Sequence, residues 1–202
     1  MSVAFTETMR GFYAPGAPGY DTGDLLGRAD GFRLAFRLTI SAPNVAAVIA
    51  DPNHQMAATG TILVKEFGPT PRPVADGGTF GLFAPARRGR YTMRYRLPFH
   101  TMTGTAMTLL GHKDVGDDHG PDLWPDTTTL YTRLLRGHVD WPQDEAGRTD
   151  EYGRGILRLT APMFARQLTT LRGESAELAR FGVFFGRQLF AAYRGPYRRY
   201  SV

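Results

Sequence analysis

The side chains best suited to chemistry gather between Gly111 and Tyr131. This segment begins with His112 and Lys113, continues through an acidic loop, and reaches a Trp124-Pro125-Asp126 corner followed by three threonines. It holds one of only two lysines and one of only two tryptophans in the chain. Because functional residues often occupy loops on a rigid scaffold, we expect these polar groups to gather at one rim of a β-barrel.

Two other interpretations of this segment stay open. In a purely structural one, Asp126 caps a turn, Trp124 plugs the bottom of the barrel and the threonines suit a strand. The other is a metal site, because imidazole and carboxylate are suitable ligands for iron, zinc or manganese. The side chains that could form such a site are His112, Asp117, Asp118, His119, Asp122 and His138. Their spacing matches no standard site, so we predict no metal.

Several classes of chemistry lack the residues they require. The chain has no cysteine, which excludes disulfides, thiolate metal ligands and a thiol nucleophile. The only serines are Ser2, Ser41, Ser175 and Ser201, and none lies in a Gly-x-Ser-x-Gly elbow. No glycine-rich dinucleotide or Walker-type loop is present. We therefore predict no cofactor. Separately, His54 and His100 stand alone in predicted turns, and we expect both to lie at the surface.

Two segments alternate between apolar and polar residues with the period of a half-buried strand. In 32–40 every even position is large and apolar, and 90–99 presents an inner face of five apolar or aromatic side chains. The residues of that face are Tyr91, Met93, Tyr95, Leu97 and Phe99. Less regular strands are predicted at 3–13, 56–67, 79–83, 104–115, 127–139 and 155–159, which brings the total to eight.

The helical period appears in three places. A short helix is predicted from Pro43 to Ala50, capped by Ser41, where it would cover one mouth of the barrel. After Thr160 the pattern predicts a helix over 162–171 and a second over 174–193, whose apolar stripe would dock on the sheet. Eight sequential strands followed by helices favour a mainly β fold, an eight-stranded antiparallel up-and-down barrel with C-terminal helices. A β-sandwich packed on helices is the alternative.

Composition is consistent with one folded domain over residues 1–202, with strands over about 3–159 and helices over about 161–193. Of the 202 residues, 42% are hydrophobic, which is ample for a core. The net charge of +5 comes almost entirely from arginines. Many alternate with apolar residues, as Arg33, Arg37, Arg90, Arg94 and Arg96 do, which is typical of a solvated barrel exterior. We predict no nucleic-acid partner, no membrane span, a cytoplasmic location and a possible homodimer.

The remaining candidate site is the interior of the barrel. Its aromatic and apolar lining suits a long apolar ligand oriented by few polar groups. It also suits catalysis by conformational restraint, in which a hydrogen bond polarises a substrate carbonyl. The predicted catalytic residues are Tyr131, His112, Tyr95 and Glu7. The predicted substrate-binding residues are Phe36, Phe80, Met93, Trp124 and Asp126.

Four strings carry a resemblance to a known domain. They are Phe5-Thr6-Glu7-Thr8-Met9-Arg10-Gly11, Asp51-Pro52-Asn53-His54 before Gly60-Thr61, Gly78-Thr79-Phe80-Gly81-Leu82-Phe83, and 123–131 with its Leu-Trp-Pro-Asp start. The chain resembles an uncharacterised actinobacterial domain associated with cholesterol-oxidase-like glucose-methanol-choline oxidoreductases and hydrolases. That resemblance implies a steroid-like or lipid-like ligand. In architecture the chain is also similar to lipocalin-like barrel cyclases of actinobacteria.

Two functions follow as hypotheses. The first is a cofactor-independent cyclase or isomerase that closes a ring by cycloaddition in an apolar polyketide-like substrate. The alternative is a non-catalytic carrier of a hydrophobic ligand, or an accessory subunit of an oxidoreductase. The similarity to barrel cyclases is one of fold, which does not determine function.

Overall fold

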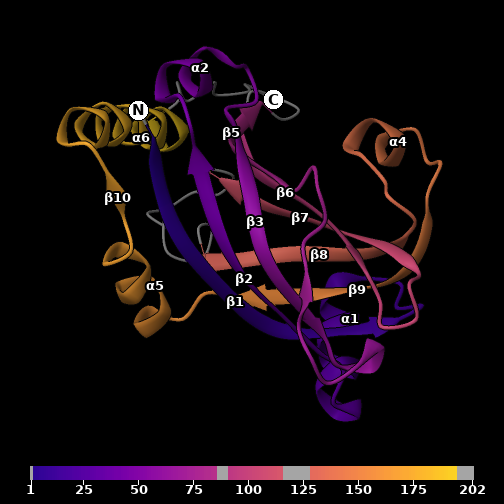
Figure 1. Cartoon of the computed structure of the whole chain (residues 1–202). Helices are drawn as coiled ribbons and strands as arrows, with labels where there is room; N and C mark the ends of the chain where they lie inside the picture. Colours follow the sequence, from indigo (N-terminus) through magenta and orange to yellow (C-terminus); the bar gives the residue numbers. More distant parts are fainter. Residues whose placement is uncertain (1, 86–90, 116–127, 195–202) are drawn as a thin grey trace, which may run out of the picture.

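The computed structural model of the chain describes residues 2–85, 91–115 and 128–194, and for residues 193 and 194 it describes the backbone alone. Eight long strands in these ranges form one antiparallel sheet, in which each strand pairs with the next along the chain (Figure 1). They are β1 (Val3–Pro15), β2 (Arg33–Ala42), β3 (Gln55–Val64), β5 (Thr79–Pro85), β6 (Tyr91–His100), β7 (Ala106–Val115), β8 (Thr129–Arg136) and β9 (Asp150–Arg158).

The sheet closes on itself because β9 also pairs with β1. This pairing runs from Arg10 opposite Arg158 to Pro15 opposite Gly153. The predicted fold class, a closed eight-stranded antiparallel barrel with C-terminal helices, is confirmed, and the sandwich alternative is wrong. Closure removes the unpaired strand edges that an open sheet would expose.

The remaining elements are short strands and helices. Two-residue strand β4 (Arg72–Pro73) pairs with β3, and β10 (Arg172–Gly173) pairs with the start of β1. The helical elements are α1 (Tyr20–Asp30), α2 (Val45–Ala50), the 3-10 turn η1 (Lys65–Phe67), α4 (Trp141–Glu145), α5 (Ala161–Leu168) and α6 (Ser175–Arg194). The predicted helices correspond to α2, α5 and α6, whereas α1 and α4 were not predicted.

Helix α1 escapes prediction because its sequence contains glycines, which weaken a helix by about 1 kcal/mol each relative to alanine. The structure explains two of them. A Cβ atom at Gly23 would lie 2.0 Å from the carbonyl oxygen of Arg154, and one at Gly27 would lie 2.2 Å from that of Tyr13. Glycine therefore lets α1 lie directly against the backbones of β1 and β9.

The two ends of the barrel are closed differently. At the end where β1 begins, α2 and α6 lie next to each other, and α1 lies at the opposite end (Figure 1). At the α1 end, aromatic rings fill the opening: Phe67 packs against Phe99 and Tyr152, and Tyr13 packs against Phe32. We call the end under α2 and α6 the helix-covered mouth.

Helix α6 covers this mouth with one apolar face. Phe181 and Phe184 are each 8% exposed, and the ring of Phe185 lies 5.4 Å from that of Phe83. His54, expected at the surface, is instead buried here, with its ring 4.8 Å from that of Phe184 and its Nδ1 atom 3.1 Å from the carbonyl oxygen of Val48. The turn around His54 can be predicted from the sequence, but its burial under the C-terminal helix α6 cannot.

Helix α2 starts later than predicted, because β2 continues through Ser41 to Ala42. Its cap is Asn44, whose side-chain oxygen accepts a hydrogen bond from the backbone N–H of Ala47 at 3.0 Å. Ser41 is paired in the sheet with Ala57 and is not the cap. Thr160 does stand at the N-cap of α5, although its side chain makes no capping hydrogen bond there.

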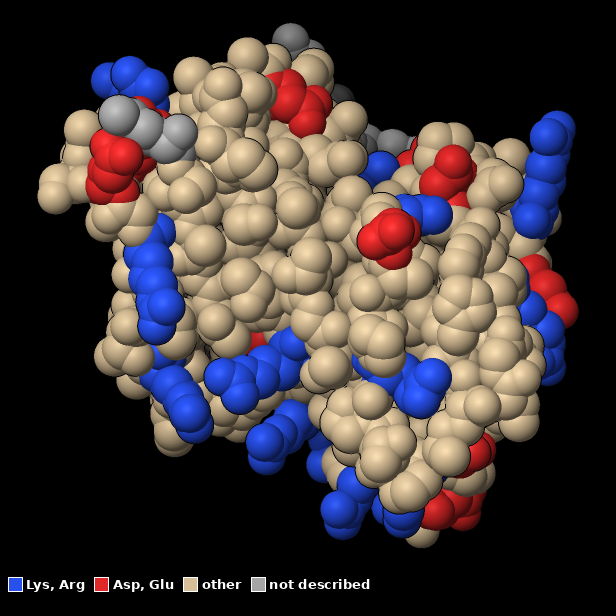
Figure 2. All heavy atoms as spheres, in the orientation of Figure 1, with Lys and Arg blue, Asp and Glu red and all other residues tan. Residues whose placement is uncertain are grey.

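The outer surface of the barrel carries the arginines that the alternation places there. Arg33 and Arg37 are exposed on β2, while Arg94 and Arg96 are partly covered on β6; Arg90 lies outside the described residues. Figure 2 shows basic side chains along the lower left of one face and a largely uncharged centre. Within the described ranges, no helix combines the length and apolar character needed to span a membrane.

Candidate functional site

Three polar side chains meet inside the barrel. Glu7 comes from β1, Tyr95 from β6 and Lys113 from β7, so strands on opposite sides of the barrel contribute to one cluster. Each side chain points inward because it occupies the core-facing phase of its strand. We call these three residues the inner cluster.

The geometry of the inner cluster is that of a hydrogen-bonded ion pair. The Lys113 ammonium donates to Oε1 of Glu7 at 2.9 Å, and the Tyr95 hydroxyl donates to Oε2 of Glu7 at 2.8 Å. The Lys113 Nζ atom also lies 5.3 Å from the centre of the Tyr95 ring, within range of a cation–π interaction. Both oxygens of the carboxylate are thus engaged.

The cluster is withdrawn from water. The side chains of Lys113 and Glu7 are 2% and 3% exposed, and Tyr95 is fully buried. Burial raises the pKa of the Tyr95 hydroxyl well above its ordinary range, and the adjacent Glu7 carboxylate raises it further. Tyr95 therefore stays protonated at any physiological pH and remains a hydrogen-bond donor.

Apolar side chains surround these groups. The ring of Tyr95 lies 5.8 Å from that of Phe36 and 4.8 Å from that of Phe80, and Met93 pairs with Lys113 across the β6–β7 register. Of the residues predicted from sequence, the structure brings together Glu7, Tyr95, Phe36, Phe80 and Met93 in the interior. Glu7, Tyr95 and Lys113 are thus hydrogen-bonding groups among mainly apolar side chains.

The structure separates His112 and Tyr131 from this group. His112 precedes the inward-pointing Lys113, so it occupies the opposite face of β7, and Tyr131 is its partner on β8. With Tyr20 of α1 they form an outer aromatic cluster, in which the Tyr20 ring lies 5.7 Å from His112 and 5.3 Å from Tyr131. These two predicted catalytic residues therefore do not line the barrel interior.

Burial dominates the electrostatics of the outer cluster. It lowers the pKa of His112, with Arg94 and Arg133 acting in the same direction and Asp114 and Asp144 opposing them. Burial raises the pKa of Tyr20. His112 is accordingly held neutral in the folded protein near neutral pH.

Two predicted binding residues, Trp124 and Asp126, lie outside the described residues, as do Asp117, Asp118, His119 and Asp122 of the metal alternative. Among the residues that the structure does describe, no group of three or more histidine, aspartate or glutamate side chains could hold a metal ion. The ring of His138 packs against that of His100 at 4.9 Å, away from His112.

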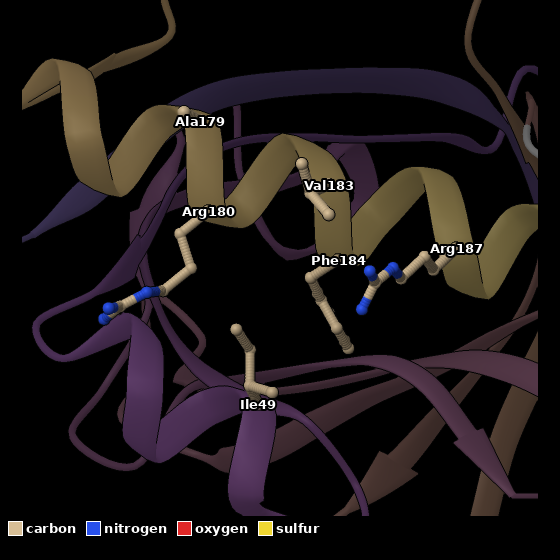
Figure 3. Close-up of a pocket in the computed structure, with 6 residues that line it drawn as sticks. All are labelled: Ile49, Ala179, Arg180, Val183, Phe184 and Arg187. Atoms are coloured by element: carbon tan, nitrogen blue, oxygen red, sulfur yellow. The ribbon is translucent and has the colours of Figure 1, made fainter.

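A groove lies on the outside of the helix-covered mouth. It is a groove of about 380 Å³ between α2 and α6, lined by Ile49, Ala179, Arg180, Val183, Phe184 and Arg187. Figure 3 shows the arginines at its two ends with Val183 and Phe184 between them. Arg180 is paired with Glu177 at 3.3 Å. This groove offers fewer kinds of reactive group than the inner cluster, because its lining consists of guanidinium groups and alkyl or aromatic carbon.

Lys113 is the functional candidate that sequence reasoning noticed but did not place in the site. Its signal is its rarity, because the chain has only one other lysine, together with its position in phase with the core residues Leu109 and Val115. A charged side chain in a core-facing phase of a strand is expected only when a partner satisfies it. That partner, Glu7, lies 106 residues away in sequence.

Fold and inner cluster together define the class of protein: a closed antiparallel barrel with a buried lysine–glutamate–tyrosine cluster beneath a helix. No family model, curated protein or solved structure matches the chain significantly.

Proposed function

We propose that this protein binds an apolar small molecule inside its barrel and promotes ring closure or isomerisation of that molecule without a cofactor. The observation that carries the proposal is the inner cluster, a set of hydrogen-bonding groups enclosed by apolar side chains. A polyketide-like substrate with a carbonyl group suits this environment. The proposal also adopts the similarity to lipocalin-like barrel cyclases.

Stability alone does not account for the inner cluster. Moving a lysine and a glutamate out of water costs several kcal/mol per ion, and apolar side chains of similar volume are often as stable or more stable. A buried ion pair in an apolar barrel is therefore a functional candidate on physical grounds. Burial raises the pKa of Tyr95 in the same cluster, and ionisable groups with a shifted pKa in enclosed positions cluster at functional sites.

The chemistry requires only donors and restraint. The Lys113 ammonium is positioned to stabilise negative charge that develops on a carbonyl oxygen of the substrate, and the Tyr95 hydroxyl would do the same by turning its single hydrogen from Glu7 to that oxygen. The barrel wall would hold a flexible chain in a folded, reactive shape, which lowers the entropic part of the barrier. Glu7 keeps both donors oriented.

Access is expected through the helix-covered mouth. Strand β7 ends at this mouth with the inward-facing Val115, and the preceding inward-facing residue is Lys113. The inner cluster therefore lies closer to this mouth than to the aromatic end. Helix α6 would move aside to admit the ligand.

The experiment is to purify the protein from its own host, identify any co-purifying apolar compound by native mass spectrometry, and incubate the precursor of that compound with fresh protein. A ring-closed isomer of unchanged mass supports catalysis. We expect Tyr95→Phe to slow turnover by about ten-fold or more, since one lost donor to a developing oxyanion has effects of this size or larger. Slower turnover in Tyr131→Phe and not in Tyr95→Phe would assign the chemistry to the outer cluster and overturn the proposal.

A non-catalytic carrier is the second candidate, and one observation favours it. Both carboxylate oxygens of Glu7 are already occupied by Lys113 and Tyr95, so Glu7 is not poised as a free base. A ligand recovered unchanged from the same incubation would identify a carrier, or an accessory subunit of an oxidoreductase as the domain resemblance implies. A cytoplasmic location and a homodimer stay predictions.

A further inference from the structure

Among the described residues, the Lys113 ammonium has a single hydrogen-bond acceptor. An ammonium group has three N–H donors, and among the described residues only Glu7 accepts a hydrogen bond from it. Because its side chain is 2% exposed, Lys113 cannot donate its other N–H groups to bulk water. Buried donors without partners are costly, so this nitrogen is positioned for a further partner supplied by a ligand.

The surroundings of this amine combine apolar side chains with one carboxylate. Its neighbours are the face of the Tyr95 ring and the apolar side chain of Met93. Glu7 lies 2.9 Å from Nζ and is the group to which the proton can pass. A lysine that passes its proton to a neighbouring base becomes a nucleophile that can attack a carbonyl carbon.

From this geometry we infer that Lys113 forms a reversible imine with an aldehyde or ketone group of an apolar ligand, with Glu7 as proton acceptor and counter-ion. This inference rests on the proposed function, because it requires the ligand to enter the barrel. It adds the substrate class: an apolar carbonyl compound.

The imine forms through a carbinolamine. The Lys113 ammonium gives one proton to Glu7, and the nitrogen lone pair then forms a bond to the carbonyl carbon, producing a carbinolamine after proton transfer to oxygen. The C–O bond breaks, water leaves with the proton held by Glu7, and a protonated imine remains beside the Glu7 carboxylate. Addition of water reverses each step and releases the ligand.

The imine would serve either proposed role. A protonated imine withdraws electrons from a conjugated double bond more strongly than the parent carbonyl, which promotes cycloaddition or isomerisation of a polyene. For a carrier it would retain the ligand covalently. In the free protein Tyr95 holds Glu7 in place through its hydrogen bond.

A second lysine in the chain serves as an internal control for the reactivity of Lys113. Lys65, the only other lysine, lies in η1 and is exposed. An exposed amine reacts with any accessible aldehyde, whereas an amine inside the barrel should select apolar ones. Selectivity between two aldehydes therefore distinguishes the two lysines.

The test uses the full chain with decanal as the apolar probe and glyceraldehyde as the hydrophilic one, with sodium cyanoborohydride to reduce any imine. Peptide mass spectrometry measures the ratio of labelling at Lys113 to that at Lys65. We expect this ratio to be about ten-fold or more higher with decanal, because the alkyl chain gains free energy on burial. Lys65→Arg should leave Lys113 labelling unchanged, and Glu7→Gln should slow it.

Displacement of a fluorescent apolar dye by decanol, which cannot form an imine, tests the pocket separately. If decanol binds but decanal does not label Lys113, the imine inference is wrong and the proposed function stands. If decanol does not bind and only Lys65 and the terminal amine are labelled, both are wrong. Circular dichroism of Glu7→Gln shows whether a loss of labelling reflects unfolding; labelling of a folded Glu7→Gln at the wild-type rate would remove Glu7 from the step.

Discussion

Glu7 and Lys113 stabilise each other while each would be costly alone. Removing one partner of a buried ion pair leaves an uncompensated charge, which typically costs about 3–5 kcal/mol. Replacing both partners with apolar groups of similar volume removes the desolvation cost as well. Stability alone therefore does not explain the presence of the pair.

A double-mutant cycle tests this at the level of the two residues. We expect Glu7→Leu and Lys113→Met each to lower the free energy of unfolding by about 3 kcal/mol, and the double variant to lie within about 1 kcal/mol of the wild type or above it. Urea unfolding followed by circular dichroism measures all four proteins. Additive losses would mean that the two charges do not depend on each other.

His112 makes folding depend on pH. Burial lowers its pKa in the folded state below the ordinary value, so the unfolded chain binds the proton more readily between the two values. The free energy of unfolding should therefore fall as the pH drops below about 6.5, the ordinary histidine value. His112→Asn should lose less stability than the wild type between neutral and acidic pH. Identical slopes in urea titrations of the two proteins would show that His112 is not the responsible group.

At the scale of elements, α6 holds the helix-covered mouth through its phenylalanines. Phe184 is 8% exposed against His54, whereas Val183 on the same helix is 56% exposed. We expect Phe184→Ala to cost about 2 kcal/mol, below the 3–5 kcal/mol typical of fully buried phenylalanine because the site borders solvent. Val183→Ala should change stability by less than about 0.5 kcal/mol. Thermal unfolding compares them, and equal effects would mean that α6 does not dock as described.

At the scale of the whole molecule, closure of the barrel depends on close contact between β1 and β9. A Cβ atom at Gly155 would lie 2.1 Å from the carbonyl oxygen of Phe12 and 2.5 Å from the Cα atom of Tyr13. We expect Gly155→Ala to destabilise the protein by about 3 kcal/mol through this overlap.

Gly186 is the matched control, since a Cβ atom there meets nothing within 4 Å on helix α6. Gly186→Ala should raise stability by up to about 1 kcal/mol, because alanine favours a helix. Urea unfolding measures both variants. A neutral Gly155→Ala would show that the β1–β9 seam is looser than the structure describes.

The regular strands are readable from sequence because one face meets the core and the other meets water. The alternation in 32–40 and 90–99 predicts β2 and β6, and with them the inward positions of Phe36, Met93 and Tyr95. The apolar stripe of 174–193 likewise predicts α6 as a helix that packs on the barrel.

The alternation is lost in β7 and β8 for a physical reason. Leu110 and Leu135 face outward, yet both are buried with Val139 in a small second core against Trp141. Apolar residues on both faces remove the signal that would distinguish inward from outward positions. This is why the sequence places His112 and Tyr131 in the interior and leaves Lys113 out of the site.

The sequence by itself determined the local structure: eight strands, the helices with an apolar stripe, and which residues of the amphipathic strands face a core. Only the tertiary structure decided that β9 returns to β1, that α6 covers the mouth near Lys113, and that Glu7 meets Lys113. These contacts join segments far apart in the chain, and no local periodicity encodes them. They arise because closing the sheet leaves no free edge and brings strands from opposite walls together around one small interior.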